Sequence, residues 1–589
     1  MEKGNFTIYR SSAGSGKTYI LSLNYIAISI LGASKNKIDY YSKILAITFT
    51  NKAASEMKSR ILRYLDILSQ KKDQDSILSW LKKETKLSKD KIYLNAKKVR
   101  DHMLHNYSNL SISTIDKFTY RIVRSFAKDL SLSQNFELEM DSSKIIQPVV
   151  ASIITKISAS GDLLSNALVK FALDKAEDGK SYNIESDLEV FCQQLFKEQS
   201  IKHIEDNAVS IEKCDHVRKL LKKEISNFEN EIKKISNEAL LFLNEKGIEP
   251  NHFSRKSYYK YFSNNILTFI PDKMLPSNSL QKQIVEKQLY TNQIKSNSKY
   301  LHIKKMIDEN IDELFNFYFS LQNFLQKELK SYISNKAIER NIHSMMVLQE
   351  LIKENKHYKD SKNIEQISDF NKKIHKLIRR QFSSFIYERI GSRYRHYLLD
   401  EFQDTSILQW QNLLPLITDS LDYGKSLVVG DGKQSIYRWR GGEVEQFLNL
   451  PTIYKGDNLE LKTEWEQKLV FHEKLENLKD NFRSKKEIIK FNNMFYDKLK
   501  HLLSKDLINI YKNHDQGLEK SKKGGYVHIE LLPKKDIGFK EQVCKRVISE
   551  IRNLVDKHNY KYQDISILCN SRKRVSLIAE SLMSADIDV

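Results

Sequence analysis

Apolar and polar positions follow two different periods along this chain of 589 residues. Short apolar or β-branched runs occur near the N-terminus and again after residue 395, and they alternate with helical segments. This pattern predicts a helix over 18–31 and strands at 6–9, 44–48, 111–115, 397–399 and 426–429. Buried strands that alternate with helices indicate an α/β fold built on a parallel sheet.

The middle of the chain has a different pattern. Between 122 and 395, apolar residues recur at spacings of three and four, and Gly and Pro are scarce. The stretches 213–244 and 300–338 show this helical period over their whole length. Because the sheet pattern resumes at 395, we predict a large all-helical insertion between strands of one sheet.

The C-terminal part predicts the start of a second α/β domain. Residues 481–503 and 540–557 have helical periodicity, and 526–532 and 565–569 have the composition of strands. At this length several domains are expected. The predicted boundaries are 1–124 with 395–477 for the first domain, 125–394 for the helical insertion, and 478–589 for a partial second domain.

A glycine-rich loop follows the first predicted strand. It consists of Ser12, Ala13, Gly14, Ser15, Gly16, Lys17 and Thr18. Glycine permits the positive φ angles that let successive backbone N–H groups surround a phosphate. In the related pattern G-x-x-x-x-G-K-[ST], the lysine reaches the β- and γ-phosphates and the hydroxyl binds Mg²⁺. The loop therefore predicts an ATP site, although Ser11 replaces the first glycine of that pattern.

Two acids follow the predicted strand at 397–399. Asp400 and Glu401 should point to opposite sides of the strand end, so their roles can divide. Asp400 would hold Mg²⁺, and Glu401 would orient and deprotonate the attacking water. Together with the glycine loop, this pair predicts ATP hydrolysis.

Composition narrows the class of partner. The net charge of +21 favours nucleic acid over other ligands. An anionic membrane surface is the rival, but no apolar run reaches 18 residues and no signal peptide opens the chain. The four cysteines lie far apart, which argues against zinc, iron–sulfur or disulfide frameworks. We therefore expect a soluble, cytoplasmic protein that binds no membrane.

Four further segments, in order, resemble motifs of superfamily 1 DNA helicases of the UvrD/Rep type. They are 46–57, 113–118, 429–442 and 481–484. The size of the insertion makes the AddA/RecB branch the closer resemblance. The family implies a RecA-like P-loop motor that uses ATP and Mg²⁺. It also implies single-stranded and duplex DNA as substrates, a protein partner of the AddB/RecC type, and a place at the bacterial nucleoid.

The resemblance implies roles at the nucleotide. Gln434 would sense the γ-phosphate, and Arg483 would act as an arginine finger on the transferred phosphoryl group. Tyr19 and Phe482 would stack on the two faces of the adenine. No glutamine motif precedes the loop to read the adenine edge.

The resemblance also implies a track for DNA. Bases would stack on aromatic rings, and backbone phosphates would meet polar side chains or the residues that hold those rings. The stacking residues would be Phe49, Tyr437 and Trp439, and the polar ones Asn51, Lys52, Thr114 and Arg440. Asp116 stands where the family usually has His.

The leading hypothesis is an ATP-dependent DNA helicase or translocase of 3′→5′ polarity that acts in repair and recombination. It would process double-strand-break ends as an AddA/RecB-like subunit. Two alternatives stay open: a stand-alone UvrD-like repair helicase, and a non-catalytic DNA-binding scaffold subunit. The later family motifs have no counterpart up to 589. We therefore expect a truncated sequence that binds nucleotide and DNA but does not unwind DNA.

Overall fold

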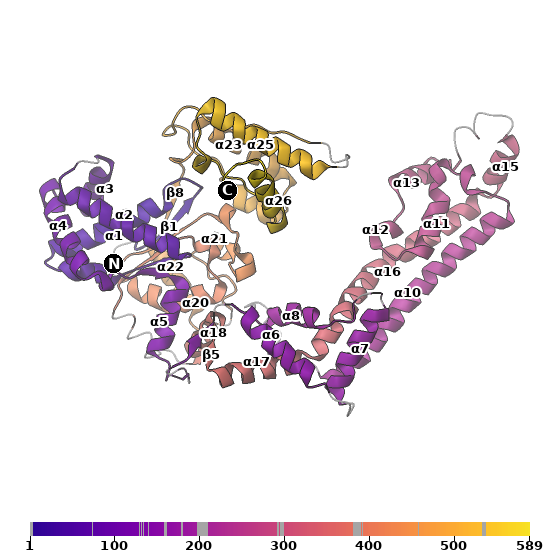
Figure 1. Ribbon diagram of the computed structural model, residues 1–589, viewed down its shortest axis with the longest axis horizontal. Coiled ribbons are helices and arrows are strands. Elements are labelled where there is room, and N and C mark those ends of the chain that lie inside the picture. The colour runs from indigo at the N-terminus through magenta and orange to yellow at the C-terminus, as the bar shows by residue number, and fades with distance from the viewer. Residues whose placement is uncertain are drawn as a thin grey trace. The chain divides into compact units, whose positions relative to one another are not determined.

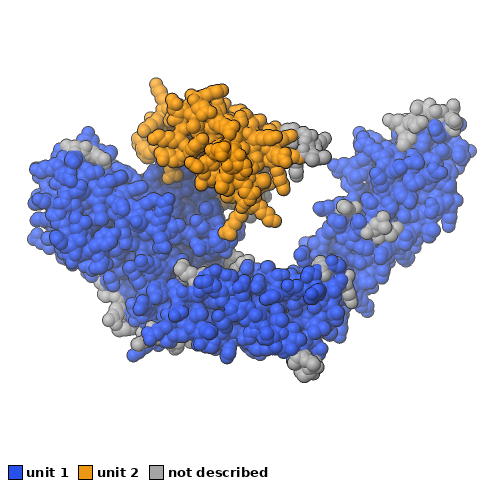
Figure 2. Space-filling model, in the orientation of Figure 1, with its two compact units in different colours: residues 1–478 blue, residues 479–589 orange. Residues whose placement is uncertain are grey.

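The chain forms two compact units in a computed structural model, Met1–Leu478 and Lys479–Val589 (Figure 2). The first unit contains a parallel sheet and a helical insertion, and the described part of the second is helical. The structure describes residues 4–72, 75–128, 130, 132–133, 135–139, 141–157, 162–177, 179, 181–196, 210–290, 294, 300–380, 390, 393–457, 459–532 and 538–589.

A six-stranded parallel sheet forms the centre of the first unit (Figure 1). In spatial order its strands are β3 (Ile112–Thr114), β2 (Ile44–Thr48), β6 (His396–Leu399), β7 (Ser426–Gly430), β1 (Phe6–Ser11) and β8 (Glu473–Leu478). Every pair is parallel, for example Ile8 beside Val428. The predicted α/β fold class is therefore confirmed, with five strands close to their predicted positions.

Successive residues of each strand face opposite layers of helices, because side chains alternate along a strand. Leu45 and Ile47 pack toward one layer, while Ile44 and Ala46 pack toward the other. The first layer contains α5 (Ile115–Ser125), α18 (Ile367–Arg380), α20 (Ile407–Ser420), α21 (Val444–Asn449) and α22 (Lys462–His472). The second contains α1 (Lys17–Ser34), α2 (Asn51–Ser69), α3 (Asp75–Thr85) and α4 (Lys89–His105). Helices on both faces bury the sheet, as parallel sheets require.

The strand order brings the predicted motifs together. The glycine loop follows β1, Asp400 follows β6, and Asp431 follows β7, which lies between those two strands. The carboxyl ends of parallel strands meet at one edge of the sheet, where ligands of α/β proteins bind. Thr18 and Asp400, 382 positions apart in the sequence, therefore come into contact.

Two long helices dominate the insertion. They are α10 (Ile211–Glu245) and α16 (Ile311–Met346), which run side by side in Figure 1 and bury aromatic pairs such as Phe228 and Tyr332. Shorter helices complete it: α6 (Ser143–Thr155), α7 (Leu163–Glu177), α8 (Glu185–Cys192), α11 (Ser257–Leu267), α12 (Pro271–Met274), α13 (Asn278–Val285), α15 (Leu301–Glu309) and α17 (Leu348–Lys362). A short parallel pair, β4 (Glu137–Leu138) with β5 (Ile364–Glu365), departs from the all-helical prediction.

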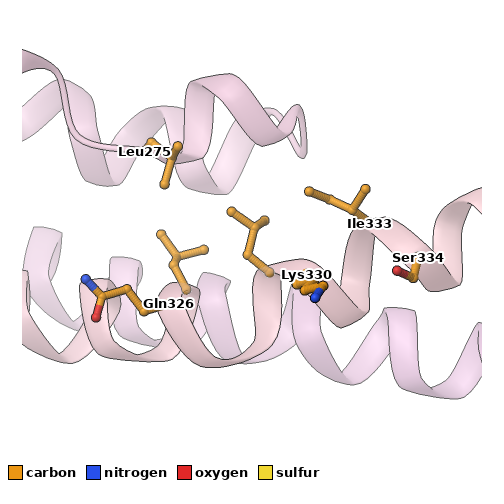
Figure 3. A pocket seen from close by; sticks show the side chains of 7 residues that line it. Leu275, Gln326, Lys330, Ile333 and Ser334 are labelled. Carbon is orange, nitrogen blue, oxygen red and sulfur yellow. The ribbon is translucent and has the colours of Figure 1, made fainter. Parts of the chain in front are cut away.

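A hollow on the surface of α16 is lined mainly by apolar side chains (Figure 3). Leu275 points toward α16 from the loop after α12, opposite Leu325, Leu329 and Ile333. None of the residues predicted to bind nucleotide or DNA lines this hollow.

The second unit contains α23 (Lys486–Leu499), α24 (Lys505–Tyr511), α25 (Phe539–His558) and α26 (Arg572–Met583). The helix predicted at 540–557 is confirmed by α25. The strands predicted at 526–532 and 565–569 are wrong, because the described residues there have no ladder partner. Leu531 and Leu568 are 91% and 94% exposed. An apolar run becomes a strand only when another strand pairs with it.

Within the described residues, no helix combines the length and the apolarity that crossing a membrane requires.

Candidate nucleotide and DNA site

The loop between β1 and α1 has the conformation that its glycines predict. Gly14 and Gly16 have φ angles of 75° and 88°, in a region that other residues avoid. The Ser15 N–H and hydroxyl both donate to the Ser12 carbonyl, at 3.3 and 2.8 Å. Lys17 begins α1 and is only 9% exposed. The loop therefore presents the N-terminus of a long helix, which favours anions.

Side chains from two other strand ends converge on Lys17. Its Nζ donates to Gln434 Oε1 at 3.1 Å and lies 3.2 Å from Glu401 Oε2. Gln434 Nε2 in turn donates to Asp431 Oδ2 at 2.6 Å. The structure thus brings together the lysine, the acid and the glutamine that the sequence assigns to the γ-phosphate.

Thr18 and Asp400 form a pair of oxygen ligands beside them. The Thr18 hydroxyl donates to Asp400 Oδ2 at 3.2 Å. Burial, with the nearby Glu401 charge, raises the pKa of Asp400 well above its usual range. A cation would compensate this buried carboxylate, and hard oxygen ligands suit Mg²⁺. The residues present therefore fit the predicted ion.

Glu401 is held in a turn. It has φ 51° and ψ 46°, a left-handed conformation that is unusual for a residue other than glycine. Its N–H donates to Asp400 Oδ1 at 3.0 Å, and Gln403 Nε2 donates to Glu401 Oε2 at 2.8 Å. The predicted alternation of the two acids along a strand end is wrong, because β6 ends at Leu399 and the turn directs Glu401 to Lys17.

Gln403 and Asp404 link the nucleotide side to the predicted DNA side. The Gln403 amide donates to Glu401, and its Oε1 accepts the Asp431 N–H at 2.9 Å. Asp404 accepts backbone N–H groups from 436–437, and burial raises its pKa to about 6. One short segment therefore contacts both functional loops. Sequence reasoning missed this role, although Gln-Asp directly follows the Asp-Glu pair.

Three aromatic rings form what we call the aromatic platform: Phe49, Tyr437 and Trp439. The ring centroids of Phe49 and Tyr437 lie 4.3 Å apart, and those of Tyr437 and Trp439 lie 6.2 Å apart. Trp439 is 70% exposed, and the Arg440 guanidinium lies 5.2 Å from its ring. An exposed row of aromatic rings beside a cation is the composition of single-strand binding sites.

The remaining predicted DNA contacts lie at helix starts. Asn51 and Lys52 are exposed in the first turn of α2, directly after Phe49 and the capping residue Thr50. Thr114 is buried, and its hydroxyl accepts the N–H of the third residue of α5 at 3.2 Å. Thr114 therefore shapes the backbone, whereas Asn51 and Lys52 present their side chains to solvent.

The two residues predicted to stack on adenine lie in different units. Tyr19 is half-buried in α1 and meets the Tyr64 ring edge-on at 6.0 Å. Phe482 is exposed in the second unit, with the Lys520 ammonium 5.7 Å from its ring. The side chain of Arg483 is also exposed there.

Comparison with known protein families identifies the chain. Residues 2–455 match the UvrD/REP helicase N-terminal domain, and residues 477–589 match the UvrD-like helicase C-terminal domain. The chain belongs to the UvrD/REP helicase family. The resemblance inferred from the motifs is therefore confirmed.

Curated relatives of this UvrD/REP family member are named as ATP-dependent helicase/nuclease subunits, of the AddA type. The Listeria innocua protein is 25% identical over 85% of this chain, and the Clostridium novyi protein 24% over 92%. The Lactobacillus helveticus protein is 23% identical over 100% of the chain. The chain spans 39%, 42% and 48% of those three proteins, which is less than half of each.

A second pair of acids follows the aromatic platform in this UvrD/REP chain. The Glu443 N–H donates to the Thr405 carbonyl at 3.2 Å, and its carboxyl is only 3% exposed. Burial, together with the Glu445 carboxyl hydrogen-bonded to it, raises the pKa of Glu443 from 4.5 to about 7. Lys455 Nζ, 3.9 Å away, offsets only part of this effect. Glu443 therefore holds a proton more tightly in the folded chain than in the unfolded one.

Replacing Glu443 with Gln should reduce the loss of stability as pH rises. A folded-state pKa above the unfolded one gives stability below pH 4.5 that is lost as pH rises toward 7. The full shift corresponds to roughly 3 kcal/mol. Thermal unfolding at pH 5 and pH 8 should show a smaller decline in E443Q than in the wild type. Glu56→Gln, at an exposed site on α2, is the control and should keep the wild-type decline.

Proposed function

We propose that this chain is the ATP-driven motor of a DNA helicase or translocase. One observation carries the proposal: a continuous set of contacts runs from Lys17 through Glu401, Gln403 and Asp404 to the backbone of Tyr437. A motor must connect the chemistry of its fuel to its grip on the track. These contacts supply such a connection across one edge of the sheet.

The nucleotide half of the mechanism follows from the converging side chains. The glycine loop would bind the phosphates of ATP, with Lys17 at the β- and γ-phosphates. Thr18 and Asp400 would hold Mg²⁺, which when bound neutralises phosphate charge. Glu401 would accept the proton of the attacking water, and Gln434 would report the presence of the γ-phosphate. Phe482 and Arg483 would act from the second unit.

The DNA half rests on the aromatic platform. Stacking on Phe49, Tyr437 and Trp439 would hold bases of any sequence, as a translocating motor needs. Loss of the γ-phosphate would change the contacts of Gln434 and Glu401. Gln403 and Asp404 would pass that change to the loop that carries Tyr437. The grip on the strand would thus alternate with the nucleotide state.

For the cellular role, we propose an AddA-like subunit of 3′→5′ polarity that processes double-strand-break ends in the bacterial cytoplasm. Support comes from relatives named as helicase/nuclease subunits and from the large insertion, proposed here as domain 125–394. A partner of the AddB/RecC type would complete the assembly. The motor itself would span 1–124 and 395–477, followed by 478–589.

ATP hydrolysis measured with and without single-stranded oligothymidylate tests the proposal. We expect turnover that rises at least tenfold with DNA, since the coupling contacts link the two sites by more than about 1.4 kcal/mol. Binding of DNA without any ATP hydrolysis would contradict the motor and favour a scaffolding role.

A further inference from the structure

A row of cations lies along the outer face of α5, a helix for which neither the motifs nor the relatives assign a role. Lys117, Arg121 and Arg124 follow one another at spacings of four and three, so they share one face. All three are exposed, whereas Phe118 and Val123 on the opposite face are buried in the core. The row extends roughly 10 Å along the helix.

Two residues from neighbouring elements extend this row. Lys58 of α2 lies close enough to Lys117 and Arg121 for their charges, after burial, to lower its pKa. Its ammonium lies 5.5 Å from the ring of Tyr107, which precedes β3 and is half exposed. We call these five residues the α5 patch: Lys58, Tyr107, Lys117, Arg121 and Arg124.

The cations of the α5 patch lack compensating acids. Among the residues that the structure describes, no carboxylate forms an ion pair with any of the four. Asp116 is the acid of α5, and its Oδ1 accepts a hydrogen bond from Gln409 Nε2 at 3.2 Å. Like charges held together on one surface attract a polyanion.

The position of the α5 patch relates it to the aromatic platform. Burial raises the pKa of Asp116, and the nearby Arg440 guanidinium opposes that shift, so the start of α5 faces the Arg440 loop. Lys117 therefore lies at the end of α5 nearer to Trp439, and Arg124 lies farther from it. The row of cations leads away from the platform.

We propose that the α5 patch binds the backbone phosphates of single-stranded DNA where the strand leaves the aromatic platform, with Tyr107 stacking on one base. The inference rests on the proposed function, since it extends the same track. A row of cations with an exposed aromatic ring is suited to a flexible strand, whose phosphates and bases are both accessible. An acidic protein surface would use the cations but not the ring.

The triple variant K117Q/R121Q/R124Q tests the proposal in the full chain. Binding of fluorescent oligothymidylate is measured over a salt series without nucleotide. Each lost phosphate contact lowers the slope of log K against log salt by about 0.7, so the triple variant should lose about 2. The matched control K91Q/K97Q/K98Q removes the same charge from exposed positions on α4 and should keep the wild-type slope.

Tyr107→Ala gives an independent result. It should weaken binding about fivefold or more and leave the salt slope unchanged, because stacking releases no counterions. If the triple variant and the control have equal slopes while the wild type binds DNA, the α5 patch is not a DNA site, and the motor proposal stands. If the wild type binds no oligothymidylate at any salt concentration, the motor proposal fails as well.

Discussion

Glu401→Gln should lower ATP turnover by about 10²–10⁴-fold, the range over which a positioned general base acts. The amide cannot accept the proton of the attacking water, while its size preserves the contacts to Lys17 and Gln403. ATP affinity should therefore stay near the wild-type value. Steady-state hydrolysis and binding of a fluorescent ATP analogue, measured on the same preparation, separate the two effects.

Two further variants make the Glu401 test decisive. Lys17→Ala should lose nucleotide affinity itself, because Lys17 would meet the phosphates directly. Glu464→Gln, at an exposed position on α22, should behave like the wild type. Turnover in E401Q within about fivefold of the wild type would assign the general base to another residue.

The double variant Y437A/W439A should lose about 2–6 kcal/mol of affinity for single-stranded DNA, if each ring stacks on one base. Both rings lie in the exposed platform, so their loss leaves the buried core unchanged. Fluorescence anisotropy of oligothymidylate gives the affinity. Basal ATP hydrolysis should persist, and its stimulation by DNA should disappear.

Replacement by Phe at both positions provides the matched control. Y437F/W439F keeps two aromatic faces and should retain most of the affinity. Equal losses in the Ala and Phe variants would show that stacking does not hold the strand. The measurement therefore distinguishes base stacking from a contact through the Tyr437 hydroxyl or the Trp439 N–H.

The sheet was predictable because its central strands are buried on both faces. Runs such as 44–48 and 426–429 are apolar throughout, and their ends carry glycine or acid motifs. The edge strand β8 escaped prediction, since Glu473–Leu478 is half polar and takes its order from pairing with β1. The segment 526–532 shows the reverse case, with a strand composition but no partner.

The candidate site was predictable only where the chemistry is local. The phosphate loop and the Asp400-Glu401 pair are each contiguous in sequence, so their residue types suffice. The contacts of Gln403 to Asp431, and the raised pKa of Glu443, depend on burial and on strand order. No pattern along the chain encodes those quantities, which arise when β6 and β7 pair.

The hydrogen bonds of Asp404 to the backbone at 436–437 also constrain the energetics of the proposed motor. Two ligands coupled through one protein obey reciprocity: if ATP changes the affinity for DNA by some factor, DNA changes the affinity for ATP by that factor. The DNA strand would thus be an allosteric effector of nucleotide binding as much as a track. A motor with this geometry would sense whether it is loaded through the occupancy of its own fuel site.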